Sequence, residues 1–243
     1  MSSLLSGRVV VVSPHVDDAV FSLAGTLARA ARSGAEVEVL TIFAHDPESE
    51  GPANGWDTRA GFTTEGEAAR ARREEDREAC GLVGAEPRWL PFRGGGYTKE
   101  RNPDQIWEAA AAVVAHADSV LVPGFPLTNP DHAWVSDLFT KRLSTGRLGL
   151  YAEQPYRYQV RRKRPSPELP PAVDDRASVA WTSSRQGLAV YRLKRKAIRA
   201  YASQLPLLGF GSGGIHRKLD LMLFHEAFQR GEAIAWVRGE TRP

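Results

Sequence analysis

The chain has 243 residues, which is enough for one large α/β domain or two small ones, and we expect a single domain over residues 1–243. Its 32 basic and 29 acidic side chains alternate through most of the sequence and leave a net charge of +3, which favours a soluble enzyme over a nucleic-acid-binding protein. The single cysteine, Cys80, excludes a disulfide framework, and no apolar run reaches transmembrane length, so we expect a cytoplasmic protein with no membrane span.

Over residues 1–153, short apolar runs alternate with amphipathic patterns. Predicted strands lie at 8–13, 36–43, 87–92, 119–124 and 147–153, and predicted helices lie at 19–34, 64–84, 103–117 and 132–144. Alternation of this kind indicates βαβ units. It predicts a Rossmann-like core with a doubly wound, mostly parallel sheet and helices on both faces.

The pattern changes in residues 154–243, which we interpret as a C-terminal α/β extension that completes the pocket of the same domain. This part contains a predicted strand pair, a helix, a Gly-rich loop, a second helix and a last strand, at 177–181 with 187–193, 194–204, 209–214, 216–228 and 233–238.

Two polar segments interrupt these elements. Residues 44–63 are long and rich in turn residues, and a loop of this length in a compact domain is usually either a lid or disordered. Residues 157–164 form a basic cluster, RYQVRRKR, that precedes a Pro-rich run. We interpret the cluster as a solvated loop, or else as a contact for an anionic substrate or lipid head group.

Side chains with metal-binding chemistry follow two of the predicted strands. The first strand is followed by His15, Asp17 and Asp18, and the fourth by Asn129, Asp131 and His132. In open parallel sheets, ligands bind outside the carboxyl ends of the strands, where the winding direction reverses. If the first and fourth strands are neighbours, as in the common doubly wound order, the two groups lie together at that edge.

The adjacent carboxylates Asp17 and Asp18 repel each other and need a compensating cation. Two histidines and one carboxylate are a common ligand set for a divalent metal, with a fourth position left to water. Such a site can use Asp18 as a ligand and leave Asp17 free as a general base. The structural alternative is that Asp17 or Asp18 caps the helix beginning near residue 19, and that His132 is a surface or capping residue.

The two motifs also resemble those of a known family. PHVDD at 14–18 and NPDH at 129–132 are similar to the signature motifs of the PIG-L (LmbE-like) zinc-dependent N-deacetylases, usually P/A-H-P/A-D-D and H-P/x-D-H. Weaker similarities are RREEDREACGLVG, with Arg72 and Glu75 in register, then KRKAIRAYASQ and HEAF. The resemblance covers roughly residues 8–230.

The resemblance implies that His15, Asp18 and His132 bind Zn²⁺ and that Asp17 is the general base. It implies removal of an acetyl or larger acyl group from the amine of a sugar-like substrate, as in glucosaminyl inositol compounds, glycolipids or pseudo-sugars of antibiotic pathways. Around this centre we expect Asp131 to support a metal ligand. Substrate contacts are expected at Arg72, His45, Tyr156 and His216.

One position departs from the family pattern. The second motif usually begins with a histidine thought to stabilise the oxyanion or supply a proton, and this chain has Asn129 there. An amide can donate a hydrogen bond but cannot give up a proton. Either Asp17 handles both proton transfers, or His45 or His216 substitutes, or activity is reduced.

Two rival functions follow from these residues. Reduced activity would leave a pseudoenzyme that binds zinc and an acylated sugar without turnover. Paired carboxylates at a strand end also occur in phosphoacceptor or Mg²⁺ proteins, but such a site uses oxygen ligands and gives no role to His15 or His132.

Overall fold

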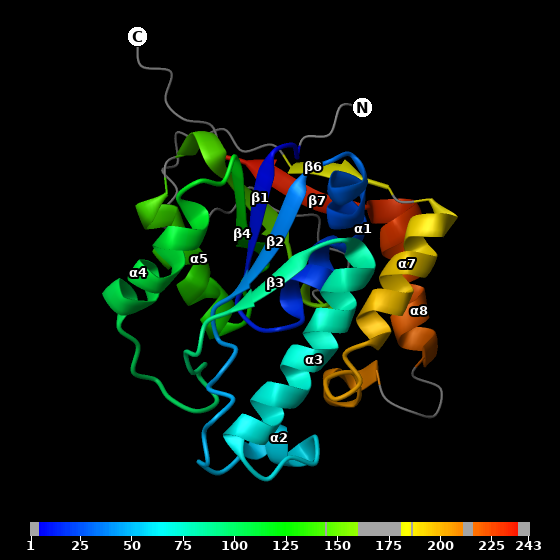
Figure 1. Cartoon of the computed structure of the whole chain (residues 1–243). Helices are drawn as coiled ribbons and strands as arrows, with labels where there is room; N and C mark the ends of the chain where they lie inside the picture. Colours follow the sequence, from blue (N-terminus) through cyan, green and yellow to red (C-terminus); the bar gives the residue numbers. More distant parts are fainter. Residues whose placement is uncertain (1–4, 144, 160–180, 186, 211–215, 238–243) are drawn as a thin grey trace.

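In the computed structural model, which describes all residues except 1–4, 144, 160–180, 186, 211–215 and 238–243, the chain forms a seven-stranded sheet in the order β3-β2-β1-β4-β5-β7-β6 (Figure 1). Five strands pair in parallel: β1 (Arg8–Ser13), β2 (Glu36–Thr41), β3 (Glu86–Trp89), β4 (Ser119–Phe125) and β5 (Leu148–Ala152). β7 (Glu232–Trp236) and β6 (Trp181–Ser184) extend the sheet with antiparallel pairing. This confirms the α/β fold with a mostly parallel sheet.

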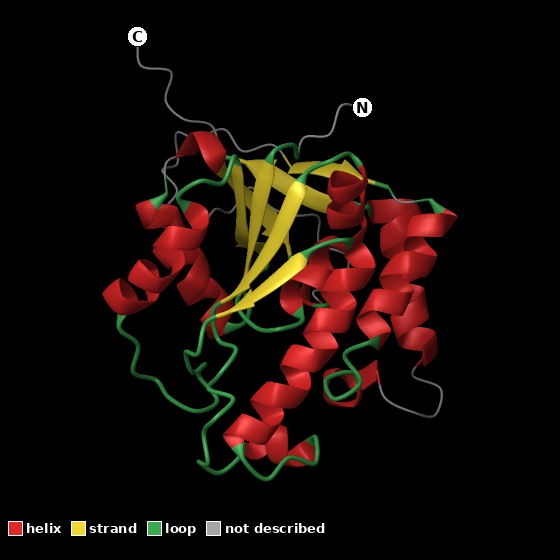
Figure 2. Ribbon diagram, viewed as in Figure 1, coloured by secondary structure: helices red, strands yellow, loops and turns green. Residues whose placement is uncertain are grey.

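Helices cover both faces of the sheet (Figure 2). One face carries α1 (Asp18–Arg32), α3 (Glu65–Val83), α7 (Leu188–Arg199) and α8 (His216–His225), and the other carries α4 (Pro103–Val114) and α5 (Pro130–Arg142). Shorter helical segments are α2 (Gly55–Arg59), α6 (Tyr156–Gln159), η1 (Thr145–Arg147), η2 (Pro206–Phe210) and η3 (Glu226–Arg230). No described helix combines the length and apolar character that crossing a membrane requires.

The central strand β1 is buried on both sides, as its uninterrupted apolar sequence predicts. Val9 and Val11 join the core under α1, whereas Val10 and Val12 join the core under α4 and α5. All four valines are fully buried. This packing fixes the direction of β1 and therefore the place where the polar residues after it emerge.

The predicted strand at 187–193 is wrong, because these residues form the beginning of α7. The buried residues of α7, Val190, Lys194, Ala197 and Ile198, recur at helical spacing. The run GLAVYRL is too short to separate a strand from a buried helix by periodicity alone. The partner of β6 is instead β7, and residues 177–180 of the other predicted strand lie outside the described part.

The long polar segment 44–63 has a defined structure. Asn54 caps α2 by accepting hydrogen bonds from the N–H groups of Trp56 and Asp57, at 2.9 and 2.8 Å. The indole of Trp56 donates to Gln204 at 3.1 Å, which joins this segment to the C-terminal part of the chain. The segment is therefore a structured wall that contacts the residues following α7.

Of the basic cluster at 157–164, only 157–159 fall within the described residues. Arg157 is buried and donates a 3.1 Å hydrogen bond to the carbonyl oxygen of Gly231. This arginine is therefore neither solvated nor a contact for an external anion.

A buried ionic cluster holds the C-terminal part against α1. Lys194 Nζ lies 2.7 Å from Glu226 Oε2 and 2.8 Å from Glu232 Oε1. Glu232 in turn accepts hydrogen bonds from the N–H groups of Gly25 and Thr26, at 2.9 and 2.7 Å. One lysine thus compensates two buried carboxylates, and one of them is fastened to the middle of α1.

Replacing Lys194 by Met should lower the free energy of unfolding by about 3–5 kcal/mol, because both carboxylates would lose their buried cation. Urea unfolding followed by circular dichroism measures the change. Lys196→Met on the exposed side of α7 is the matched control and should stay within about 0.5 kcal/mol of the parent. Equal stability of the two variants would contradict this role of Lys194.

Candidate metal centre

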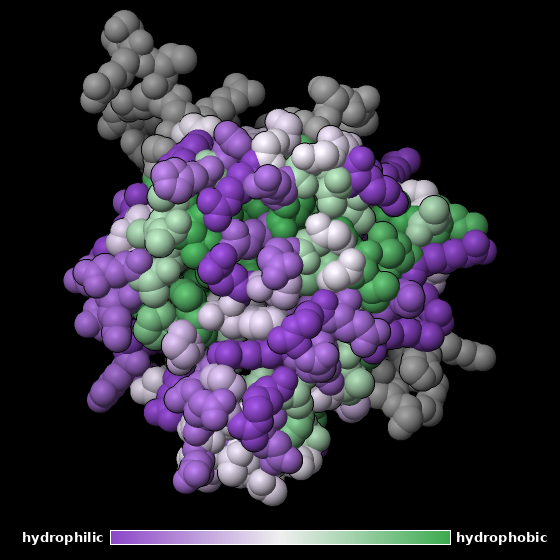
Figure 3. Space-filling view, viewed as in Figure 1, coloured by the Kyte–Doolittle hydropathy of each residue, from purple (hydrophilic) through white to green (hydrophobic). Residues whose placement is uncertain are grey.

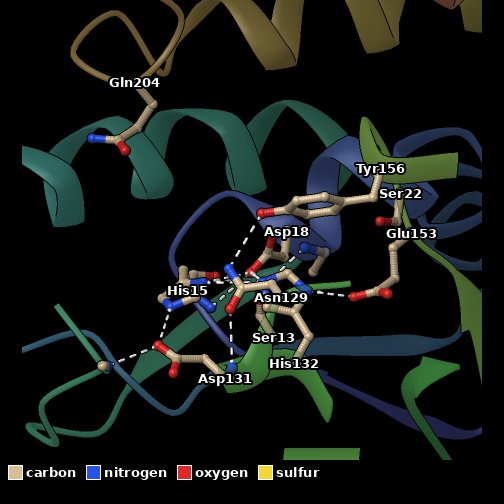
Figure 4. A network of polar contacts seen from close by, with 12 residues as sticks. Ser13, His15, Asp18, Ser22, Asn129, Asp131, His132, Glu153, Tyr156 and Gln204 are labelled. Carbon is tan, nitrogen blue, oxygen red and sulfur yellow. Dashed lines mark hydrogen bonds and ion pairs between the residues drawn. The ribbon is translucent and has the colours of Figure 1, made fainter. Parts of the chain in front are cut away.

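The two polar groups meet at the carboxyl edge of the sheet because β1 and β4 are neighbours. β1 ends at Ser13 and the chain turns through His15 into α1, whose first residue is Asp18. β4 ends at Phe125 and the following loop leads to Asn129, the N-cap of α5, so that His132 lies in the first turn of that helix. Figure 4 shows these side chains pointing toward one another.

Three donor atoms converge on one point. His15 Nδ1 lies 3.1 Å from Asp18 Oδ2 and 3.2 Å from His132 Nε2, and Asp18 Oδ2 lies 3.1 Å from His132 Nε2. Tetrahedral zinc ligands at 2.0–2.1 Å from the ion lie roughly 3.3 Å apart, so this triangle fits a zinc ion with little adjustment. Two nitrogen donors also favour zinc over Mg²⁺, which prefers oxygen ligands.

Each histidine is held from behind by a carboxylate. His15 Nε2 lies 3.0 Å from Asp131 Oδ2, and His132 Nδ1 contacts Glu153 Oε1. These contacts leave His15 Nδ1 and His132 Nε2 as the free donor atoms, which is the orientation that a metal site requires. Asp131 therefore lies where the sequence predicts a supporting residue.

Glu153 is a supporting residue that the sequence analysis missed. It is buried just after β5, and its Oε2 accepts a 2.8 Å hydrogen bond from the N–H of Leu127. The available signal was an acidic residue at the carboxyl end of a strand next to β4. That signal is weak by itself, because only the fold brings Glu153 to His132.

Two glycines allow Asp131 to reach its place. Asp131 Oδ2 accepts a 2.9 Å hydrogen bond from the N–H of Gly95, and Oδ1 contacts Arg101. A Cβ atom added at Gly94 would lie 2.8 Å from Asp131 Oδ2, and one added at Gly95 would lie 2.9 Å from Oδ1. Gly94 and Gly95 therefore pack closely against this carboxylate, where a larger residue would displace it, and the sequence analysis did not predict this role.

Mutual compensation of charge dominates the electrostatics. Burial opposes protonation of His15, but hydrogen bonds to Asp131 and Asp18 outweigh it and raise the pKa of His15 to about 9. Burial likewise opposes protonation of His132, but the charge of Asp18 and the hydrogen bonds that the imidazole donates to Asp18 and Glu153 raise the pKa of His132 well above its usual value. The imidazoles in turn overcome the burial of Asp18 and hold the pKa of this carboxyl below its usual range. Without a metal, the two imidazoles supply the positive charge that Asp18 needs; a bound cation would supply it instead and would leave both imidazoles neutral, as metal ligands must be.

Asp17 differs from Asp18 although the two are adjacent. Its side chain makes no capping hydrogen bond to α1, which removes the structural alternative for this residue. Burial, followed by the charge of Asp18, raises the pKa of Asp17 to about 7. Asp17 is partly exposed in the cavity and does not belong to the converging triangle.

A cavity of about 720 Å³ lies against the donor triangle. Its wall includes Asp17 and four of the positions singled out in the sequence: His45, Arg72, Asn129 and Tyr156. The side chain of His216 lies outside the described part of the chain. Four aromatic residues of the wall were not named in the sequence analysis: Phe43, Trp56, Tyr97 and Trp134.

His45 and Arg72 are both engaged with buried carboxylates. His45 Nδ1 lies 3.2 Å from Glu65 Oε1, and burial lowers the pKa of His45 to about 4 despite this contact. The guanidinium of Arg72 contacts Asp57 of α2, which is buried. Each of these two residues therefore connects α3 to the segment 44–63 in addition to lining the cavity.

Asn129 faces the cavity in a defined orientation. Its Oδ1 accepts a 2.9 Å hydrogen bond from the N–H of Asp131, so its Nδ2 is the end left to donate. Nδ2 lies 3.5 Å from the hydroxyl of Tyr156, whose ring contacts the ring of His132 edge-on with centroids 5.1 Å apart. Asn129 therefore combines a helix cap with a hydrogen-bond donor directed at the cavity (Figure 4).

Comparison with known proteins places the chain in a family. Residues 10–143, more than half of the chain, match the family PIG-L: GlcNAc-PI de-N-acetylase. The chain belongs to this family, and the resemblance inferred from PHVDD and NPDH is confirmed. No curated protein sequence matches the chain.

Solved structures with the same fold include a deacetylase of similar size. The A40926 pseudoaglycone deacetylase Dbv21 is 26% identical, with a TM-score of 0.73 over 95% of this chain and 96% of its own. An N,N'-diacetylchitobiose deacetylase from Pyrococcus horikoshii is 18% identical, with a TM-score of 0.54 over 94% of this chain and 84% of its own. The 4-carboxy-2-hydroxymuconate hydratase GalB from Pseudomonas putida is also 18% identical, with a TM-score of 0.58 over 98% and 97% of the two chains. The fold is therefore shared by at least two kinds of enzyme.

Replacing Glu153 by Gln should weaken zinc binding by roughly 10- to 100-fold, because the carboxylate that orients His132 would lose its charge. Competition with a chromophoric chelator measures the affinity. Glu38→Gln is the control, since Glu38 pairs with Arg8 on β1 and Arg88 on β3, away from the donor triangle. A Glu153→Gln protein that binds zinc as tightly as the parent would show that His132 does not depend on this contact.

Proposed function

We propose that the protein is a zinc-dependent hydrolase that removes an N-acetyl or other N-acyl group from an amino-sugar or sugar-like substrate. The observation that carries the proposal is the convergence of His15 Nδ1, Asp18 Oδ2 and His132 Nε2 beside a free carboxylate in a large cavity. Membership of the family and the 26% identity to a pseudoaglycone deacetylase support the choice of an acylated amine as substrate.

When bound, a zinc ion would polarise an amide carbonyl and acidify a water molecule. Asp17 takes up the proton of the attacking water, because its partly exposed carboxyl group lines the cavity beside the donor triangle and is not itself a member of that triangle. Asn129 Nδ2 donates a hydrogen bond toward the carbonyl oxygen as negative charge develops on it. His15 and His132 hold their donor atoms in place through Asp131 and Glu153.

The proton for the departing amine comes from Asp17 in this proposal. Asn129 has no proton to give, and the low pKa of His45 leaves that imidazole neutral at physiological pH. Asp17 is charged before the attack and protonated after it, so the same carboxyl group returns the proton to the amine. The absence of the usual histidine therefore places both transfers on one residue.

A zinc-binding pseudoenzyme is the second candidate, and Asn129 is the observation that favours it. Acetate release distinguishes the two. The protein is loaded with one equivalent of zinc and incubated with N-acetylglucosamine, N,N'-diacetylchitobiose and an aryl N-acetylglucosaminide. Acetate produced by the parent but not by His132→Ala supports the hydrolase. A protein that holds one zinc and releases acetate from none of these compounds would be the pseudoenzyme.

Asp17→Asn should lower turnover by roughly 10²- to 10⁴-fold and leave zinc binding unchanged, because the amide cannot accept the proton and Asp17 is not a ligand. Elemental analysis and steady-state rates measure the two effects on the same preparation. Asp18→Asn is the matched comparison, and this variant should lose both turnover and zinc. Loss of zinc from Asp17→Asn alone would exchange the roles of the two carboxylates.

Asn129→Ser should lower turnover by roughly 10²-fold while zinc stays bound, because serine keeps the helix cap but has no amide donor that reaches the cavity. Steady-state rates with the best substrate of the panel measure the effect. Asn102 caps α4 in the same way, so Asn102→Ser controls for the loss of a cap and should leave turnover unchanged. Similar rates for both variants would mean that Asn129 is only a cap.

A further inference from the structure

Apolar side chains reach the surface on the pair of helices α7 and α8. Leu188, Leu221 and Phe224 are large hydrophobic residues exposed to 52%, 57% and 48%. Figure 3 shows hydrophobic surface at the right of the molecule, over the beginning of α7, with hydrophilic side chains beside it. Single exposed leucines are ordinary, but three exposed apolar residues on two adjoining helices form a patch.

The same helices carry a strong positive charge. α7 contains no acidic residue, and its outward side presents Arg192, Lys196 and Arg199. None of these three side chains makes an ion pair with a described residue, and the buried Nε of Arg199 has no hydrogen-bond partner. By contrast, Arg195 is compensated, because it contacts both carboxylate oxygens of Asp220.

The apolar and basic residues belong to one continuous face. Arg195 of α7 pairs with Asp220 of α8, and Tyr191 of α7 contacts Phe224 and then Phe228, with ring centroids 6.4 and 5.9 Å apart. Residue numbers thus fall along α7 as they rise along α8, so the two helices run antiparallel. On α7, Leu188, Arg192 and Arg199 recur at intervals of four and seven and lie on one stripe.

A hollow of about 370 Å³ lies within this face. Its wall contains the four basic residues Arg192, Arg195, Lys196 and Arg199, together with Tyr191 and the single acid Asp220. The hollow is separate from the cavity at the metal centre, since the two share no residue. Its size and charge suit a phosphate-bearing group.

We propose that the face formed by Leu188, Leu221, Phe224, Arg192, Lys196 and Arg199, the α7–α8 face, binds the surface of a membrane that contains anionic phospholipids. The basic residues lie among the lipid phosphates while the apolar residues enter the interfacial layer. Nucleic acid would also attract the arginines, but it offers nothing to the exposed leucines. A second copy of the chain would place the same uncompensated cations against one another.

The α7–α8 face does not include the cavity at the metal centre, so membrane binding through this face would not use the residues that line the cavity. Gln204 and Leu208, which follow α7 in the chain, line the cavity at the metal centre. This part of the cavity wall lies next to α7, but it includes none of the six residues of the α7–α8 face. Binding of the α7–α8 face to a bilayer would therefore leave the cavity at the metal centre free of the residues that contact the lipid.

The test is co-sedimentation of the zinc-loaded full chain with vesicles. Vesicles of phosphatidylcholine alone are compared with vesicles in which about 30 mol% of the lipid is phosphatidylglycerol, so that only the second kind carries a negative surface potential. We expect partitioning to the anionic vesicles only, and a decrease as salt is raised from about 0.05 to 0.5 M. Equal binding to both kinds of vesicle, or no binding to either, would overturn the proposal.

Two variants separate the contributions. Each cation near an anionic surface is worth roughly fivefold in partitioning, so Arg192→Gln, Lys196→Gln and Arg199→Gln combined should lower it by roughly 100-fold. Leu221→Ser with Phe224→Ser should also lower it. The control combines Arg32→Gln, Arg77→Gln and Lys141→Gln, three exposed cations elsewhere, and should bind like the parent.

Two alternative partners of the α7–α8 face, a second copy of the chain and a nucleic acid, are tested with the same proteins. Light scattering that shows a dimer in the parent and a monomer in Leu221→Ser with Phe224→Ser, without vesicle binding, would assign the face to a second copy and overturn the proposal. If the parent shifts the electrophoretic mobility of a DNA duplex, the triple Gln variant does not, and neither binds vesicles, the face binds nucleic acid and the proposal is also overturned. If the control falls as far as the triple Gln variant, net charge alone drives the binding and the assigned face is wrong.

Discussion

The site depends on the compensation of one buried carboxylate, Asp18, by the two imidazoles that face it. Asp18 lies where β1 ends and α1 begins, and its Oδ2 is 3.1 Å from both His15 Nδ1 and His132 Nε2, so that either protonated imidazoles or a cation held between these donors offsets its buried charge. His15 is three residues away in sequence, but His132 comes from the neighbouring strand β4. The pairing of β1 with β4 is therefore what makes the donor triangle, and the buried valines of β1 fix that pairing.

Much of the fold follows from periodicity in the sequence. In residues 1–153 the sequence predicts the five parallel strands and the four long helices, because β1, β2, β4 and β5 are buried apolar runs and the helices between them repeat at helical spacing. The short helix α2 was missed, because it lies in the polar segment 44–63. The beginning of α7 was missed because GLAVYRL is apolar at almost every position, and the helical period emerges only when Lys194 and Ala197 are found buried. The burial of Lys194 depends on Glu226 and Glu232, which are far away in sequence and which no local pattern reveals.

The sequence predicts those residues of the site that directly follow a strand, because the carboxyl ends of parallel strands lie at one edge of the sheet. His15, Asp18 and His132 form one triangle because each lies at the same edge, which sequence order and the doubly wound topology already imply. Glu153, Gly94 and Gly95 were not predicted, because their effect is on other side chains. Glu153 orients His132, and the glycines admit Asp131. These contacts join segments that are far apart in the sequence, and no local sequence pattern shows that the folded chain brings such segments together.

The central claim is that His15, Asp18 and His132 share one zinc ion. Diffraction from crystals prepared with one equivalent of zinc, measured on both sides of the zinc absorption edge, tests it most directly. The account predicts one anomalous peak at about 2.0–2.1 Å from His15 Nδ1, Asp18 Oδ2 and His132 Nε2, with Asp17 outside bonding distance. A peak bound by Asp17 in place of Asp18, or a peak on other residues with none between the two histidines, would contradict it.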